Sequence, residues 1–188
     1  DAIQVVRDNL GGDCANLSYR VGIHSGKTMV GNIGYQHRVN YTVCGTPVNI
    51  AARMEQLGKE YGVTPLVTDA VVRGTSLIRG AVVSGATSAF FFILIDIIKV
   101  HGHKTTLTEV YHLVCRVDKV TKNMLEASRF YDSVHQFIRD GRPGDALASI
   151  RAALSDKKYP EYDQALKKLE ENIQKGEITP SSYRDEGL

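Results

Sequence analysis

The sequence predicts an α+β fold that is followed by a short α-helical tail. In the first part of the chain, short runs rich in β-branched and aromatic residues alternate with one amphipathic helix pattern. In the last part, apolar residues recur every three or four positions, as on the buried face of helices. We therefore expect a first domain over 1–120, a helical appendage over 121–176 and a disordered polar tail over 177–188.

Glycine and proline residues and the spacing of apolar residues together delimit the elements of the first domain. Helix patterns cover 2–10, which stops at Gly11-Gly12, and 47–61, where Ile50, Met54 and Leu57 share one side and Pro47 lies near the start. Runs typical of strands are separated by turn residues, and the fourth run passes into a turn of helix. These strand runs cover 19–26, 27–34, 38–45, 64–72, 90–100 and 107–114, the last two pairing around the turn HGHKTT.

Three helices are predicted in the tail. The first covers 123–139, the second covers 145–155 with Asp145 as its N-cap, and the third runs from about 161 to 175 and ends at Gly176. Gly141 to Gly144 separate the first two helices. The spacing resembles about one and a half tetratricopeptide-like units, which is too short for a repeat array.

Composition excludes several classes of protein. Of the 188 residues, 43% are hydrophobic and 23% charged, as in a soluble globular protein, and the net charge of +2 is too small to indicate nucleic-acid binding. Cys14, Cys44 and Cys115 form no CxxC pair, which argues against a disulfide scaffold or a zinc module and favours a reducing, cytoplasmic location. The uncharged run 80–95 is short of the ~20 apolar residues of a membrane span, so a buried strand is the better interpretation. The opening residues do not read as a signal peptide.

Several motifs have ordinary structural readings. Gly26-Lys27-Thr28 ends like a phosphate loop, but the spacing from Gly22 is one residue short and no helix pattern follows, so we reject a nucleoside-triphosphatase site. His24 is expected to be structural. The lysine pairs 157–158 and 167–168 indicate solvated faces.

The segment 41–54 carries the most informative side chains. Asn49 and Arg53 are four residues apart and project from one face of the predicted helix. An amide beside a guanidinium suits a phosphate or another oxyanion, and the hydroxyl of Thr42 on the preceding strand can donate or accept. Taken alone, an arginine such as Arg53 on a helix is more often a solvated or salt-bridged surface residue.

Three ordered motifs together resemble class III nucleotidyl cyclases. RVGIHSG (20–26), VGNIG (30–34) and YTVCGTPVNIAARME (41–55) are similar to the second half of that family's catalytic domain. Residues 95–114 resemble the two strands that close the domain. The resemblance implies a ferredoxin-like domain whose front part precedes this chain, and it covers about residues 2–115.

The resemblance also implies roles for individual residues. Asn49 and Arg53 match the family's Asn and Arg that stabilise the ribose and the phosphate in the transition state. Thr42 matches the purine-reading position and favours adenine. His101 stands where the family has a lysine that binds the polyphosphate, and Lys104 is placed to compensate. The family's metal-binding aspartates and its purine-reading lysine are expected upstream.

By this resemblance, the protein is expected to convert ATP to 3′,5′-cyclic AMP and pyrophosphate, with two Mg²⁺ or Mn²⁺ ions. The implied partner is a second cyclase domain in a homodimer or heterodimer, and the helical tail is expected to offer a surface to another protein. A missing upstream region could tether the protein to a membrane.

Two alternatives stay open, a guanylate cyclase and a non-catalytic cyclase-homology domain that regulates or binds a partner. A third is a helical interaction module for which 1–115 is the scaffold.

Overall fold

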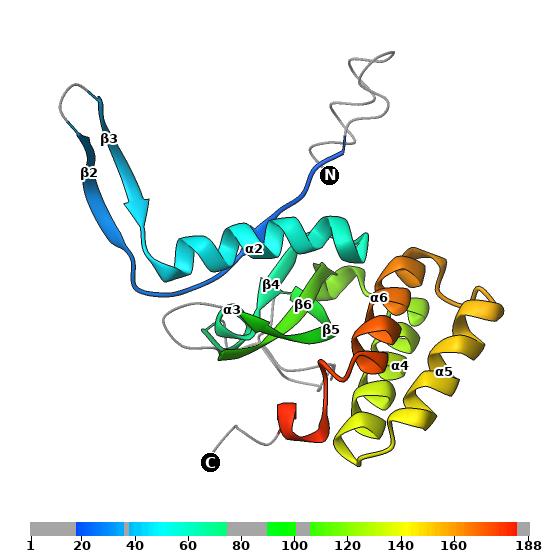
Figure 1. Ribbon diagram of the computed structural model, residues 1–188. Helices are drawn as coiled ribbons and strands as arrows, with labels where there is room; N and C mark the ends of the chain where they lie inside the picture. Colours follow the sequence, from blue (N-terminus) through cyan, green and yellow to red (C-terminus); the bar gives the residue numbers. More distant parts are fainter. Residues whose placement is uncertain (1–17, 36–37, 75–89, 101–105, 184–188) are drawn as a thin grey trace.

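The computed structural model describes residues 18–35, 38–74, 90–100 and 106–183 (Figure 1). Its strands are β1 (Gly22–Ile23), β2 (Met29–Tyr35), β3 (Arg38–Cys44), β4 (Leu66–Thr68), β5 (Phe90–Val100) and β6 (Thr106–Arg116). Its α-helices are α2 (Thr46–Tyr61), α3 (Asp69–Gly74), α4 (Lys122–Arg139), α5 (Pro143–Ser155) and α6 (Asp163–Gln174). Short 3₁₀ turns are η2 (Val117–Lys119), η3 (Pro160–Tyr162) and η4 (Pro180–Tyr183). This mixture of strands and helices confirms the predicted α+β class.

Within the described residues, the main sheet has four strands in the order β1-β4-β6-β5. β1 and β4 are parallel, whereas β4 and β6, and β5 and β6, are antiparallel. β5 and β6 pair from Phe90 opposite Arg116 to Val100 opposite Thr106, which confirms the predicted strand pair. The turn between them, like the predicted helix over 2–10 and residues 80–89 of the uncharged run, lies outside the described residues.

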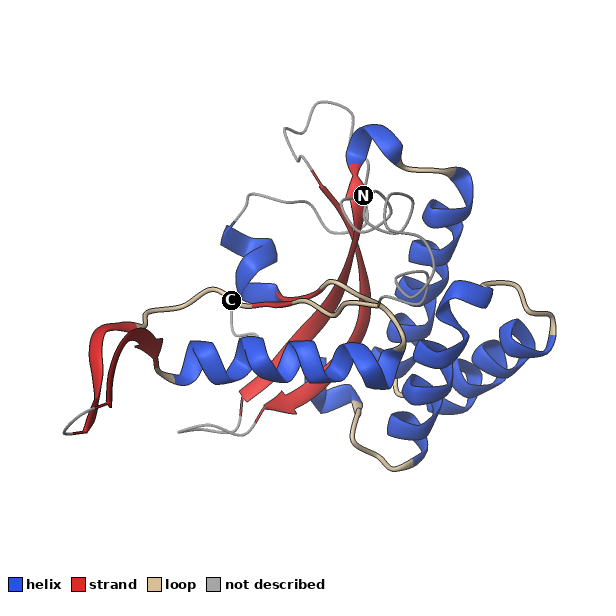
Figure 2. Cartoon of the chain, turned by 90° about the horizontal axis from the view of Figure 1, so that it is seen from above, coloured by secondary structure: helices blue, strands red, loops and turns tan. Residues whose placement is uncertain are grey.

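β2 and β3 form a separate two-stranded hairpin that projects from the rest of the molecule (Figures 1 and 2). We call this hairpin, residues 29–44, the arm. Its strands pair antiparallel from Met29 opposite Cys44 to Tyr35 opposite Arg38. The arm exposes apolar side chains along its length, namely Met29, Val30, Ile33, Tyr35, Val39, Tyr41 and Val43.

Helix α2 packs against β1 and β4 and buries the face that its periodicity predicts. Met54, Leu57 and Tyr61 are buried, and the helix ends where Gly62 adopts a left-handed conformation with φ 68°. The packing against β1 is close, because a Cβ at Gly22 would lie 2.2 Å from the carbonyl oxygen of Ala51. Glycine at position 22 therefore lets the helix rest directly on the strand.

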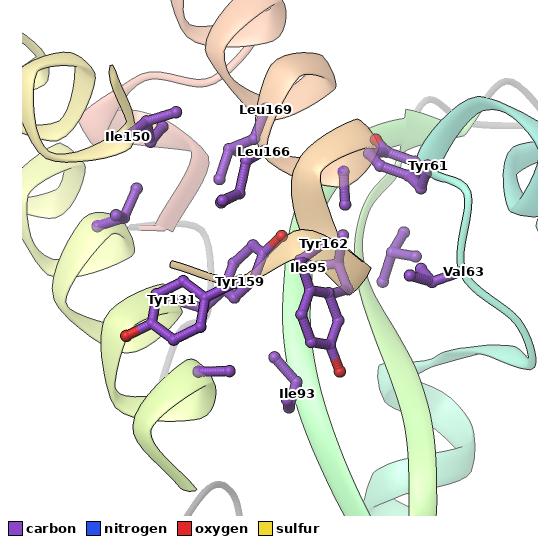
Figure 3. Close-up of a cluster of buried hydrophobic side chains, with 14 of the residues drawn as sticks. Tyr61, Val63, Ile93, Ile95, Tyr131, Ile150, Tyr159, Tyr162, Leu166 and Leu169 are labelled. Atoms are coloured by element: carbon purple, nitrogen blue, oxygen red, sulfur yellow. The ribbon is translucent and has the colours of Figure 1, made fainter. Parts of the chain in front are cut away.

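The three tail helices pack side by side, α4 against α5 and α5 against α6, and they share one hydrophobic core with the sheet. Figure 3 shows Tyr131, Tyr162 and Leu169 of the tail in the same buried cluster as Ile93 and Ile95 of β5. All five side chains are almost completely buried. The predicted first domain and its appendage are thus joined by a continuous core. The tetratricopeptide-like arrangement remains a prediction.

Two details of the tail differ from the prediction. Helix α5 begins at Pro143, two residues before the predicted cap Asp145, because proline is well suited to the first turn of a helix. Asp145 instead accepts a hydrogen bond from Nε of Arg142 at 2.6 Å. The predicted disordered tail also has order up to residue 183, because Ile178 is buried and the Tyr183 hydroxyl bonds Nδ1 of His135 at 2.7 Å.

None of the helices in the described residues is long and apolar enough to cross a membrane. The described end of the uncharged run, from Phe90 onward, belongs to strand β5, as the sequence predicts.

Candidate functional site

Thr42, Asn49 and Arg53 lie on two consecutive elements, the second strand of the arm and helix α2. Thr42 is exposed on β3 opposite Gly31. Gly45, with φ 133°, turns the chain into α2, and its carbonyl oxygen accepts from the amides of Val48 and Asn49 at 3.1 and 3.4 Å. Within the described residues, no hydrogen bond or ion pair joins Thr42 to Asn49 or Arg53. His101 and Lys104 lie outside the described residues.

Asn49 and Arg53 are both exposed on α2, one turn apart, as their spacing predicts. The first turn of α2 has no acidic side chain, and Gly45 contributes no capping side chain. The helix dipole places a partial positive charge at this end of α2. Pro47 has no N–H and the amides of Val48 and Asn49 donate to the Gly45 carbonyl, so donors to an anion here would come from the Asn49 and Arg53 side chains.

Arg53 borders a pocket of about 390 Å³ between α2, β5 and helix α6 of the tail. Its side chain is 48% exposed, and one guanidinium nitrogen lies 3.6 Å from Oε1 of Glu60. Lys99 from β5 and Lys168 from α6 line the same pocket. The pocket therefore combines charged side chains from the first domain and from the tail.

A buried polar cluster lies beside this pocket. Oδ2 of Asp96 on β5 accepts hydrogen bonds from the Tyr61 hydroxyl at 2.5 Å and from Nδ2 of Asn172 at 2.7 Å. Oδ1 of Asp96 accepts from the amide of Ile97 at 2.7 Å. Burial raises the pKa of Asp96 to about 6, although these three hydrogen bonds act to lower it.

This cluster was not predicted from the sequence. Asp96 is the only charged residue between Phe90 and Ile98, and a lone carboxylate in an apolar strand is the signal that could have identified it. Its partners Tyr61 and Asn172 are 35 and 76 residues away.

Two histidines have structural roles. Nδ1 of His24 lies 2.7 Å from the Thr68 hydroxyl, and burial lowers the pKa of His24, which agrees with the predicted structural role. His112 on β6 contacts the Tyr162 hydroxyl through Nδ1 at 3.0 Å and the Thr64 carbonyl through Nε2 at 3.3 Å. Burial lowers the pKa of His112 to about 4, so the ring is neutral at pH 7.

The described residues do not fit a two-metal site. They contain no group of three or more His, Cys, Asp or Glu side chains that could hold a metal ion. Asp96 is directed into the Tyr61–Asn172 cluster. No chemical step is therefore assigned to a metal held by these residues.

Comparisons with known proteins agree with the motifs. The family model of the adenylate and guanylate cyclase catalytic domain matches residues 2–114. An adenylate cyclase of Anabaena cylindrica is 43% identical over 60 residues, which are 32% of this chain and 12% of that protein. Adenylate cyclase 1 of Rhizobium meliloti is 45% identical over 53 residues, which are 28% of this chain and 8% of that protein.

A third relative gives the longest of these three alignments. The terminal-differentiation-specific adenylate cyclase of Dictyostelium discoideum is 34% identical over 96 residues, covering 50% of this chain and 4% of that protein. The chain thus corresponds to a small part of each of these relatives. Because the family model matches more than half of the chain, the chain belongs to the adenylate and guanylate cyclase catalytic domain family.

Proposed function

We propose that this chain supplies the ribose- and phosphate-binding side of an adenylate cyclase site, in a protein that converts ATP to 3′,5′-cyclic AMP and pyrophosphate. The observation that carries the proposal is the exposed pair Asn49 and Arg53 on consecutive turns of α2, in a chain of the cyclase family. Relatives named adenylate cyclases support the choice of ATP.

In this reaction the 3′-oxygen of ATP attacks the α-phosphorus while the bond to the β-phosphate oxygen breaks. The 3′-hydroxyl proton is lost and pyrophosphate leaves. Arg53 has a permanently charged, planar guanidinium that can donate two hydrogen bonds to the phosphate as negative charge moves onto it. The Asn49 amide orients the ribose. A donor that acts mainly on charge present in the transition state raises kcat more than it lowers KM.

Thr42 is proposed to read the adenine. Its exposed hydroxyl on β3 can accept a hydrogen bond from the adenine amino group. One such contact contributes about 1–2 kcal/mol to discrimination between ATP and GTP. The variant Thr42→Val keeps the side-chain shape and removes the hydroxyl, so it should shift the ATP/GTP ratio of kcat/KM toward GTP by about tenfold. A wild-type protein that prefers GTP is instead a guanylate cyclase.

A second cyclase domain is proposed as the partner. The arm exposes Tyr41 by 76% and Met29 by 70%, and an isolated two-stranded hairpin buries too little apolar surface to be stable alone. A second domain that covers the arm would hold Thr42 near the nucleotide. We place the metal-binding carboxylates on that partner side, in polypeptide outside this chain.

The test is cyclic AMP formation by the full-length polypeptide that contains this chain. Arg53→Ala should lower kcat roughly 10²–10³-fold with a smaller change in KM. Arg129→Ala, an exposed arginine on α4, is the control and should leave kcat unchanged. An unchanged kcat in Arg53→Ala would remove Arg53 from the mechanism. Absence of any cyclic nucleotide product would favour the non-catalytic alternative.

A further inference from the structure

Helix α6 of the tail presents three polar side chains to the end of helix α2. Gln164, Lys168 and Asn172 are spaced four residues apart and therefore lie along one face of α6. Each of them reaches the last turns of α2 or the side chains that these turns carry. We call these three residues the α6 stripe.

The first residue of the stripe caps the C-terminus of α2. Nε2 of Gln164 donates to the carbonyl oxygens of Lys59 and Glu60 at 2.7 and 3.0 Å. The last carbonyls of a helix have no partner within the helix, so an amide from another element satisfies them. The approach is close, since a Cβ at Gly62 would lie 2.6 Å from Oε1 of Gln164.

The last residue of the stripe belongs to the buried polar cluster. Nδ2 of Asn172 lies 2.7 Å from Oδ2 of Asp96 and 3.5 Å from the Tyr61 hydroxyl. Asn172 is 4% exposed and Asp96 is fully buried. Gln164 and Asn172 thus hold α6 against α2 at both ends of the stripe. Lys168, which lies between them, is thereby held beside the last turns of α2.

That middle side chain is Lys168, which shares a carboxylate with Arg53. Glu60 lies with Oε1 3.6 Å from the Arg53 guanidinium and with Oε2 4.0 Å from Nζ of Lys168. Lys168 is 25% exposed, and all three side chains line the same pocket. Nζ of Lys168 also lies 3.0 Å from Oε2 of Glu171, a carboxylate that Lys175 pairs with as well. Glu60 therefore lies between two cations, the Arg53 guanidinium and a Lys168 ammonium that it shares with Glu171.

We propose that Lys168 is a positioning residue for Arg53, acting through Glu60. With Lys168 present, Glu60 divides its attraction between two cations and leaves the Arg53 guanidinium available to a phosphate. Without Lys168, Glu60 pairs with Arg53 alone and competes with the phosphate. The inference rests on the proposed function of Arg53. It adds that the helical tail, through Lys168, controls how strongly the Arg53 guanidinium is paired with Glu60.

The kinetic test uses the full-length polypeptide. Lys168→Met should lower kcat about three- to fivefold, the range expected for a partly exposed ion pair. Adding Glu60→Gln to Lys168→Met should restore kcat to within about twofold of Glu60→Gln alone, because the competing carboxylate charge is gone. Lys167→Met, one residue away on the exposed side of α6, is the matched control and should not change kcat. Equal kcat values in the Lys168 and Lys167 variants, or no rescue by Glu60→Gln, would overturn the proposal.

A second readout needs no turnover and uses the 188-residue chain. Phenylglyoxal modifies accessible guanidinium groups, and its rate at Arg53 can be followed by peptide mass spectrometry with Arg129 as the internal reference. Lys168→Met should slow modification of Arg53 about threefold, whereas Lys167→Met should not. An unchanged Arg53 rate in Lys168→Met overturns the positioning role whether or not the protein is a cyclase. A wild-type protein without cyclase activity counts against the proposed function alone.

Discussion

The arm and the tail-side core hold similar kinds of side chains in opposite environments. On the arm, Tyr41 is 76% and Ile33 40% exposed, whereas Tyr131 and Leu169 of the tail are fully buried against the sheet. The core buries its apolar side chains within the chain, whereas the arm leaves its apolar side chains exposed to solvent. The sheet and the tail helices are thus stabilised by a shared core, whereas the arm leaves apolar surface exposed, as expected of the proposed contact with a second domain.

The candidate site lies where these two regions meet. Thr42 belongs to the arm, and Asn49 and Arg53 belong to a helix held between the sheet and the tail. Substitutions in the core shared by the sheet and the tail helices should therefore change the stability of the fold. Substitutions in the arm should change association between chains and the preference for ATP over GTP.

The largest expected difference is in stability. Leu169→Ala should lower the free energy of unfolding by about 2–5 kcal/mol, because it leaves a cavity in the shared core. Ile33→Ala on the arm should change it by less than about 0.5 kcal/mol. Urea unfolding of the 188-residue chain measures both. Similar losses in the two variants would contradict the contrast between core and arm.

The second prediction concerns pH. The pKa of Asp96 is raised from 3.8 to about 6, so the folded state binds a proton more tightly than the unfolded state does. The contribution of Asp96 to stability is then fully present below pH 3.8 and is lost as the pH rises through about 6, a loss of about 3 kcal/mol. His112 acts in the opposite sense, because its lowered pKa makes its contribution disappear as the pH falls from 6.5 toward 4.

The two groups should partly cancel in the wild type between pH 4 and 6.5. Asp96→Asn should therefore gain stability with rising pH over that interval, and His112→Gln should lose it. Urea unfolding at pH 4.5 and 7 distinguishes the two slopes. Parallel pH profiles for the wild type and both variants would show that neither group titrates as its burial predicts.

The third prediction concerns the arm. Tyr41→Ser should weaken association between copies of the full-length polypeptide by about tenfold or more, since exposed tyrosines are frequent anchors of interfaces. Tyr19→Ser, an exposed tyrosine outside the arm, is the control. Sedimentation velocity measures the association. Equal dissociation constants for Tyr41→Ser and Tyr19→Ser would mean that the arm is not the surface that a second copy covers.

Local signals explain why most elements could be predicted. Pro47 marks the start of α2, and the runs rich in β-branched and aromatic residues over 90–100 and 107–114 indicated the paired strands β5 and β6. The start of α5 was missed because Asp145 and Pro143 are both plausible first-turn residues, and the structure uses the proline.

Contacts between distant residues could not be predicted. The bonds of Asp96 to Tyr61 and Asn172 depend on how the tail folds back onto the sheet. The same folding separates the lysine pair that the sequence placed on a solvated face. Lys167 is exposed as predicted, but Lys168 is only 25% exposed and is paired with Glu60 and Glu171. That Asn49 and Arg53 share one face could be predicted because a single helix places both.

The central claim is that this chain supplies one side of a shared cyclase site, and reconstitution tests it most directly. Full-length polypeptide carrying Arg53→Ala is mixed with the 188-residue chain, and cyclic AMP is measured with Mg-ATP. We predict that the 188-residue chain alone is inactive, that full-length Arg53→Ala alone keeps only its roughly 10²–10³-fold reduced activity, that the mixture is far more active, and that a 188-residue chain carrying Arg53→Ala restores nothing. Co-purification of the two components without any gain in activity, or cyclic AMP formation by the 188-residue chain alone, would contradict it.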